Sequence, residues 1–296
     1  MHRRQQHRTS RLQTSRWTTL VSCAVVAATM VGTASCSNPP NPPQEIPDVS
    51  VAPCTLKPAA RNTGASGSLQ DSSTTVLQDG QTLENVRVAS LEIPGTNVIV
   101  RNVEVAGKTL ITGDDVTLDR VSTASIAISS ASGTTVQYSN IGNTAEDGIH
   151  VTSDSGRMIK NVLLTHNFIH TPRVADEAHY DGTQVRGVNG LLITCSTYDP
   201  GPYRQTFNAA VFIEEANGGN RNVSVEHNWL YGFGFSIMLD ANKVRIVGNR
   251  VGGDIHWGTC AVGPLTDVTS LDIRDNFNEN TKAADAMCDA PGAQSR

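Results

Sequence analysis

Aromatic residues are scarce in this 296-residue chain, in which Phe, Trp and Tyr together make up 5%. Between residues 70 and 280 no window keeps apolar residues at three-and-four spacing across several turns, which argues against a mainly helical fold. Val, Ile, Leu, Asn, Thr and Gly recur instead, and such a composition favours thin stacked strands over bulky helix packing. We therefore expect an all-β protein.

A long hydrophobic run is also missing. The apolar segment from Leu20 to Gly32 is interrupted by Ser22, Cys23 and Thr29, whereas a spanning helix needs about 20 consecutive apolar residues. Residues 1–35 contain five Arg and no acidic residue. Because a basic start followed by a short apolar run is typical of a signal peptide, we expect this segment to be removed on export.

The four residues that end this region, Thr33-Ala34-Ser35-Cys36, resemble a bacterial lipobox. In that motif small residues precede a Cys that is lipidated and becomes the new N-terminus, although Leu is usual where this chain has Thr33. The Pro-rich stretch 38–43 is typical of a semi-rigid spacer. We expect Cys36 to anchor the protein to the cell membrane, with residues 36–68 as the linker; plain secretion is the alternative.

Basic residues are fewer than acidic residues. Subtracting the five Arg of the signal segment from the 23 basic residues leaves 18 against 28 acidic residues, so the exported chain has a formal charge of −10. Nucleic acid is therefore not expected as a partner, since phosphate binding needs a basic face. An anionic polysaccharide is still possible, because a local Arg or Lys cluster can reverse the sign within a groove.

Zinc-binding Cys spacings are absent, because the chain contains no CxxC and no Cys/His pair at metal-ligand spacing. If Cys23 leaves with the signal segment and Cys36 is acylated, four Cys remain. An even number in an exported protein indicates two disulfides, and three connectivities are possible. The candidate partners are Cys54, Cys195, Cys260 and Cys288.

A short motif recurs from about residue 95 onward. An apolar residue, any residue and a second apolar residue are followed, two or three positions later, by Asn or a substitute. The alternation is typical of a strand with one buried face. A closing Asn fits a tight turn, where it tolerates left-handed backbone and can form a side-chain ladder. The eight copies close at Asn102, Arg120, Asn140, Asn167, Ser196, Asn228, Asn249 and Asn276.

The steps between these closing residues range from 18 to 32 residues. A constant motif with a variable step is typical of a solenoid, whose coils each complete one turn while external loops lengthen freely. A β-sandwich would instead show hairpin turns at regular short spacing. We predict a single-stranded right-handed parallel β-helix over residues 69–280, followed by a C-terminal tail at 281–296.

On this repeat the chain resembles the pectin-lyase-like superfamily of right-handed parallel β-helices over roughly residues 70–280. The resemblance implies the fold but no single activity, because that superfamily includes lyases, glycoside hydrolases, epimerases, esterases and non-catalytic proteins. In β-helix enzymes of this kind the saccharide groove runs along an exposed sheet. Neither the full polygalacturonase pattern nor the Asp-rich calcium set of pectate lyases is present, so we expect no cofactor, and no motif supports Ca²⁺.

A second strand can be aligned in four successive coils. Its inward residues are Val151, Val185, Ile213 and Leu239. Its outward columns are His150, Gln184, Phe212 and Met238, and beside them Thr152, Arg186, Glu214 and Asp240. Since neighbouring coils are about 4.8 Å apart, residues of one column lie side by side, and we predict that Arg186 and Glu214 are adjacent.

Long inserts flank these strands at 167–181 and 194–208, and such loops on a rigid solenoid usually carry binding residues. The segment His179 to Gln184 resembles an H-x-D-G-x-Q stretch of uncharacterised β-helix proteins. As candidate catalytic residues the sequence offers His179, Asp181, Arg186 and Glu214. Candidate substrate-binding residues are His150, Arg173, Tyr180, Gln184, Phe212 and Asp240.

Two kinds of chemistry fit these residues. In β-elimination a base removes the proton alpha to a uronate carboxylate, and Arg186 would bind that carboxylate while His179 or Asp181 handles protons. In hydrolysis two carboxylates flank the bond, and Glu214 with Asp240 or Asp181 would supply them. Alternatively, Asp181 merely shapes a turn and Arg186 with Glu214 is only a surface ion pair.

From these residues we expect an exported, monomeric, carbohydrate-active protein, most simply a lyase acting on an acidic polysaccharide. A non-catalytic glycan-binding or surface-structural β-helix is the alternative from a different class. A glycoside hydrolase is the third.

Overall fold

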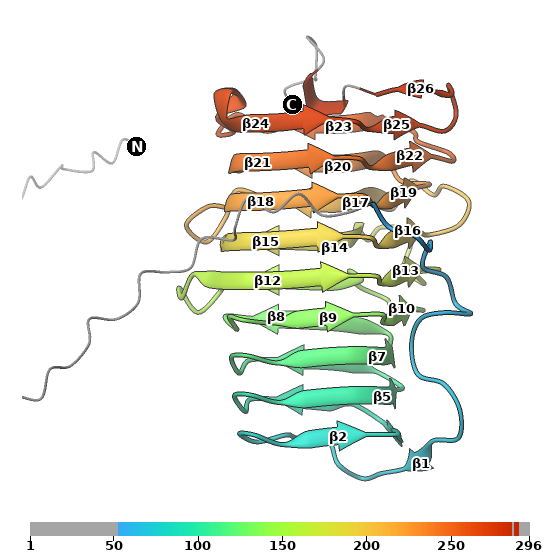
Figure 1. Cartoon of the computed structure of the whole chain (residues 1–296), viewed down its shortest axis with the longest axis vertical. Helices are drawn as coiled ribbons and strands as arrows, with labels where there is room; N and C mark the ends of the chain where they lie inside the picture. Colours follow the sequence, from blue (N-terminus) through green and yellow to red (C-terminus); the bar gives the residue numbers. More distant parts are fainter. Residues whose placement is uncertain (1–52, 286, 290–296) are drawn as a thin grey trace, which may run out of the picture. The chain divides into compact units, whose positions relative to one another are not determined.

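The computed structural model describes residues 53–285 and 287–289, which form a right-handed parallel β-helix and confirm the predicted fold (Figure 1). The predicted signal segment and Cys36 lie outside the described residues. Each coil contributes up to three strands, and equivalent strands of successive coils pair in parallel to form three columns. No described helix is long and apolar enough to span a membrane.

The first and second columns form one continuous sheet. The first column contains β2 (Thr82–Glu84), β5 (Ile99–Val105), β7 (Thr117–Thr123), β9 (Thr135–Gln137), β12 (Ile159–Thr165), β15 (Val188–Thr194), β18 (Arg221–Glu226), β21 (Asn242–Val247) and β24 (Leu271–Arg274). The second contains β1 (Gln70–Asp71), β3 (Val86–Val88), β10 (Asn140–Gly142), β13 (Phe168–His170), β16 (Thr197–Asp199), β19 (Trp229–Tyr231), β22 (Arg250–Gly252) and β25 (Phe277–Asn278). The last residues of β5 and β7 extend into the second column.

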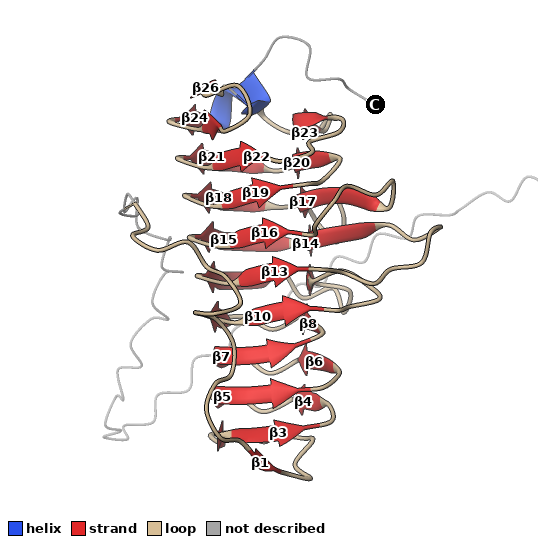
Figure 2. Cartoon of the chain, turned by 90° about the vertical axis from the view of Figure 1, so that its right-hand side faces the viewer, coloured by secondary structure: helices blue, strands red, loops and turns tan. Residues whose placement is uncertain are grey.

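The third column is a separate eight-stranded sheet, seen on the right of Figure 2. It contains β4 (Leu91–Ile93), β6 (Lys108–Ile111), β8 (Ser125–Ser129), β11 (Ile149–Thr152), β14 (Tyr180–Arg186), β17 (Phe207–Ile213), β20 (Phe235–Leu239) and β23 (Gly258–Val262). At the C-terminal end the short β26 (Ala283–Ala284) pairs antiparallel with β25. Two 3₁₀ turns, η1 (Val268–Ser270) and η2 (Met287–Asp289), also belong to this end.

The interior is a set of apolar ladders, one residue per coil. Val151, Val185, Ile213 and Leu239 are in register and each is at most 2% exposed. This confirms the predicted inward phase of the third column. Burying such a side chain stabilises the fold by about 1.5–3 kcal/mol.

A buried polar ladder lines the corner between the first and second columns. The Asn228 side chain accepts a hydrogen bond from the Ser196 backbone N–H (2.9 Å) and donates to the Ile193 carbonyl (2.9 Å). The Asn249 side chain likewise accepts a hydrogen bond from the Asn228 N–H and donates one to the Val225 carbonyl. Asn167 and Asn276 make equivalent bonds. Ser hydroxyls take the ladder position in two other coils: Ser196 Oγ accepts from the Asn167 N–H, and Ser139 Oγ accepts from the Val121 N–H.

The left-handed backbone of this corner belongs to the residue before the ladder position. His166, Cys195 and His227 have φ between 52° and 56°, whereas the closing residue itself is left-handed only in early coils such as that of Asn102. The prediction of an Asn ladder is confirmed for the later coils. The prediction that Asn140 belongs to the ladder is wrong, because Ser139 occupies the ladder position of that coil.

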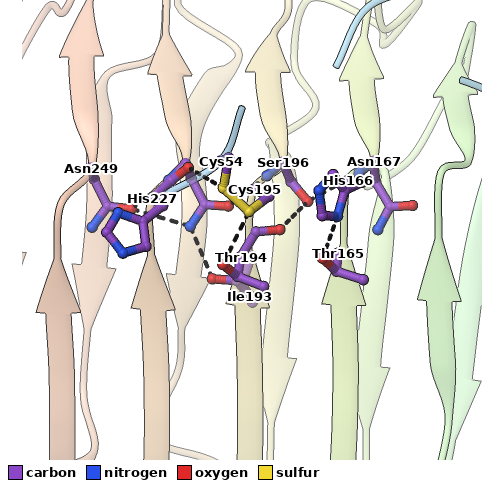
Figure 3. The surroundings of a disulfide bond; sticks show 11 residues. Cys54, Thr165, His166, Asn167, Ile193, Thr194, Cys195, Ser196, His227 and Asn249 are labelled. Atoms are coloured by element: carbon purple, nitrogen blue, oxygen red, sulfur yellow. Dashed lines mark hydrogen bonds between the residues drawn. A yellow bond between two sulfur atoms is a disulfide. The ribbon is translucent and has the colours of Figure 1, made fainter. Parts of the chain in front are cut away.

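Residues 53–68, which we call the strap, belong to the predicted linker but bind along the outside of this corner (Figure 1). Cys54 forms a disulfide with Cys195 (Figure 3). Further along, the Gly64 N–H donates to the Tyr138 carbonyl (2.7 Å). The second disulfide joins Cys260 of β23 to Cys288 of η2. Two disulfides are typical of a protein that folds outside the reducing cytoplasm.

Candidate functional site

The outward face of the third column carries the predicted polar residues in register. His150 of β11 pairs with Gln184 of β14, and Gln184 pairs with Phe212 of β17. All three side chains are half-buried. The outward phase follows from the buried phase, because a strand alternates its side chains between faces.

Arg186 and Glu214 form an ion pair on this face, as predicted. Arg186 Nε lies 3.2 Å from Glu214 Oε2, and each side chain is 33% exposed. The same carboxylate oxygen accepts a hydrogen bond from Gln184 Nε2 at 3.1 Å. The Nε–Oε2 contact is poorly aligned for a hydrogen bond, so charge rather than direction holds the pair. Glu214 is therefore already engaged by two neighbours.

His150 lies at the edge of this polar group, beside Gln184 and diagonally across from Arg186, which is in register with Thr152. Its Nε2 is buried and has no hydrogen-bond partner among the described residues. Burial lowers the pKa of His150; the charge of Asp147 opposes this shift, and that of Arg186 reinforces it. The imidazole is consequently neutral at neutral pH, with a lone pair or an N–H for a ligand.

The loop after β11 and the loop after β17 meet where the strands of the third column end. The sequence did not predict this contact. β14 and β15 are joined by Gly187 alone, whose φ of 83° and close contacts with Ser153 and Asn217 leave no room for a side chain. Asn217 Nδ2 crosses this position to donate to Asp154 Oδ1 (2.7 Å). Hydrogen bonds from Thr152 and Asn217 lower the pKa of Asp154, which adds an ionised carboxylate beside Arg186.

Asp181 is not on the groove as predicted, since it is 3% exposed. Its Oδ1 accepts hydrogen bonds from Asn208 Nδ2 (2.9 Å) and the Ala209 N–H (3.0 Å). Asp147 Oδ1 likewise accepts the Asp181 N–H (2.8 Å). Burial and the neighbouring Asp147 raise the pKa of Asp181 well above its usual range. The two Asp residues thus link successive coils, which corrects the assignment of Asp181 to proton transfer in the groove.

Tyr180 is also misassigned as a sugar platform, because it is fully buried. A register shift between Tyr180 and Asp181 turns the ring inward, where it stacks on Phe233 (5.8 Å between centroids) and meets Phe207 edge-on. Its role is to fill the core beneath the long loops.

His179 and Arg173 are exposed on the loop between β13 and β14. Among the described residues no hydrogen bond or ion pair joins either side chain to Arg186 or Glu214. In the same region Arg204 Nη2 binds Asp176 Oδ1 at 2.5 Å and ties the loop before β14 to the loop before β17. These loops flank the third column where Figure 2 shows it widening beside β14 and β17.

Chemically, the site combines a neutral imidazole, a guanidinium and a carboxylate on one open face. No group of three or more His, Cys, Asp or Glu residues in the described part of the chain is arranged to hold a metal ion. A neutral imidazole can accept a proton, and a guanidinium can bind a carboxylate through its remaining N–H groups.

No family model matches the chain, and no curated protein sequence matches it. Among solved structures, an alginate lyase from Paenibacillus sp. strain FPU-7 has a TM-score of 0.35 and 12% identity, covering 68% of this chain and 91% of that chain. A tailspike protein of E. coli bacteriophage HK620 in complex with a pentasaccharide has a TM-score of 0.29 and 12% identity, covering 72% of this chain and 58% of that chain. Because these structures overlap only partially with this chain, they assign no activity to it.

Proposed function

We propose that this chain is an exported carbohydrate-active protein of the pectin-lyase-like type that binds an acidic polysaccharide across the third column and cleaves it by β-elimination. The observation that carries the proposal is the position of His150, whose buried Nε2 lacks a partner beside the Arg186 guanidinium. A base next to a carboxylate-binding cation is what elimination at a uronate requires.

Arg186 would bind the carboxylate of the sugar unit. Its contact with Glu214 is made through Nε, so its two terminal nitrogens can form a bidentate pair with a uronate. Binding there would stabilise the negative charge that develops when the adjacent carbon loses its proton. Glu214, which accepts a hydrogen bond from Gln184, would hold the guanidinium in place.

His150 would remove that proton. In the elimination, the C–H electron pair forms the new double bond, the bond to the glycosidic oxygen breaks, and the leaving sugar is protonated by water. Because burial lowers the pKa of His150 below its ordinary value of 6.5, the base form persists into mildly acidic solution. The acid limb of kcat/KM should therefore lie below pH 6.5.

The test is incubation of the exported chain with a panel of polyuronates and neutral glycans. Ultraviolet absorbance reports unsaturated ends, and a reducing-end assay reports hydrolysis. We expect absorbance to rise with a polyuronate, and His150→Ala to abolish the rise. His179→Ala is the matched control, since the sequence offered His179 and Asp181 as alternative proton-handling residues, and it should leave turnover intact. Turnover that survives His150→Ala but not His179→Ala would reverse the assignment.

A second function, non-catalytic glycan binding, is favoured by the contact of Glu214 with Arg186, which offsets the positive charge before any ligand arrives. It predicts polyuronate binding with silence in both assays. Hydrolysis is less well supported, because Asp181 is buried and Glu214 is engaged by two neighbours.

A further inference from the structure

The third column changes character along the stack. At β11 and β14 its outward residues are His150, Gln184 and Arg186. At β17, β20 and β23 the corresponding column continues as Phe212, Met238 and Ala261, which are in register. The column of His150 and Gln184 thus becomes apolar in the second half of the face, while the neighbouring column continues from Arg186 as Glu214 and Asp240.

A hollow of about 290 Å³ lies over this apolar half. It arises because β23 ends the column with small residues. Ala261 pairs with Met238, and Gly263 follows Val262 where Asp240 follows Leu239 in the previous coil. The side chains that would fill the last coil are absent, so a depression remains with Phe212 and Met238 as its floor.

Aromatic rings lie at one end of this hollow. Phe235 lines it and packs against Trp257, with 5.6 Å between ring centroids. The Trp257 ring lies against Gly234, where any Cβ would collide with it, and the side chain is 38% exposed. Close by, Tyr203 stacks on His256 at 4.3 Å. Phe235 itself is only 7% exposed, so the apolar surface open to a sugar ring is the half-buried Phe212 and Met238, with Trp257 packed beside Phe235 at the margin.

Carboxylates lie at the opposite end. Glu214, Glu215 and Asp240 all line the hollow, and among its lining residues there is no Lys, Arg or His. Asp240 lies against the Gly263 backbone, and its Oδ1 accepts from Thr266 Oγ1 at 3.3 Å. Carboxylate oxygens can accept hydrogen bonds from sugar hydroxyls, whereas they repel the carboxylate of a uronate.

We propose that the hollow between β17 and β23 binds a neutral sugar unit, so that the groove recognises a glycan in which neutral and acidic sugars both occur. This inference rests on the proposed function, because it places the acidic unit at Arg186 and His150. It deepens that function by dividing one face into two halves of different specificity: a cationic half that binds the acidic unit and an apolar, acid-rimmed half that excludes it.

The experiment fills the hollow without disturbing the coil. Ala261→Met places in β23 the residue that Met238 provides at the same position of the preceding coil, so the variant should fold normally. Ala261→Ser keeps the hollow open and is the matched control. Binding is measured by Trp fluorescence and calorimetry with neutral oligosaccharides and with oligouronates. Turnover is measured on a polyuronate and on polymers that contain both sugar kinds.

We expect Ala261→Met to weaken neutral-oligosaccharide binding at least about tenfold, since an overfilled site leaves no room for a ring, while Ala261→Ser binds normally. Asp240→Asn should raise the affinity for oligouronates relative to neutral ones. Equal binding by Ala261→Met and Ala261→Ser, or no neutral-sugar binding by the parent chain, overturns the inference. If neutral binding depends on Ala261 but no polyuronate is cleaved, the inference stands and the lyase proposal fails.

Discussion

Two of the three corners of a coil differ in how much the length of their link varies along the stack. Between the first and second columns exactly the same short link recurs: two residues separate β12 from β13, β15 from β16 and β18 from β19. Between the second and third columns the link varies from one residue before β8 to nine before β14. The constant corner is hydrogen-bonded into a ladder, and the variable corner borders the candidate site. The corner that the ladder stabilises therefore keeps its length, whereas the corner that carries the loops beside the candidate site does not.

The largest expected effect concerns the core that both corners share. Val185→Asp puts an unpaired charge between Val151 and Ile213, at a position that is fully buried. We expect a loss of more than about 4 kcal/mol and failure to fold. Ser224→Asp, which places the same charge on the half-buried outward side of β18, in register with Arg245, should melt nearly as the parent does. A soluble Val185→Asp protein with a normal Tm would show that the inward phase is misassigned.

The constant corner should be the next most sensitive. Asn228→Leu leaves the Ser196 N–H and the Ile193 carbonyl buried without partners, and we expect a loss of about 3–5 kcal/mol, or a Tm lower by about 10 °C. Ser224→Leu, on the half-buried outward side of the preceding strand β18, is the control. Comparable melting of the two variants would remove the ladder from the account of stability.

Releasing the strap should have a smaller effect. Replacing both Cys54 and Cys195 by Ser opens a cross-link between residues 141 apart in sequence, and disulfides typically contribute about 2–4 kcal/mol. Chemical denaturation of the variant should give a midpoint below that of the oxidised parent, and the reduced parent, which also loses the Cys260–Cys288 disulfide, should not be more stable than the variant. If the variant is as stable as the oxidised parent, the strap does not stabilise the corner that it covers.

The outward face of the third column should tolerate change in stability but not in function. Arg186→Ala removes a pair that is one-third exposed, which contributes about 0–1 kcal/mol, so the Tm should hardly move. Polyuronate binding and turnover should fall by at least about tenfold, because a bidentate contact is lost. Arg157→Ala, which breaks the exposed pair with Asp114, is the control for losing an Arg. An unchanged rate with Arg186→Ala would exclude its role.

Sequence periodicity was sufficient for the fold, because each coil repeats the same alternation and the same closing residue. It also predicted the adjacency of Arg186 and Glu214, since register converts distant positions into neighbours. Tyr180 could not be placed this way, because a local register shift turns its ring inward. The burial of Asp181 could have been predicted from the sequence, since Asp181 shares the inward phase of Thr183.

Other features depend on chain segments without a repeat. The strap and the pairing of Cys54 with Cys195 require knowing where an irregular segment returns to the stack. The hollow did have a signal, because Ala261 and Gly263 are small where the aligned coil has Met238 and Asp240. The hydrogen bond from Asn217 to Asp154 joins two loops, and no sequence pattern signals it.

The most direct test of a glycan site on the third column is a crystal structure of the exported chain soaked with a mixed acidic and neutral oligosaccharide. We predict sugar density across β11 to β23, with a uronate carboxylate at Arg186 and a neutral ring over Phe212 and Met238. Sugar bound instead on the outward face of the first or second column, or along the strap, would contradict the account.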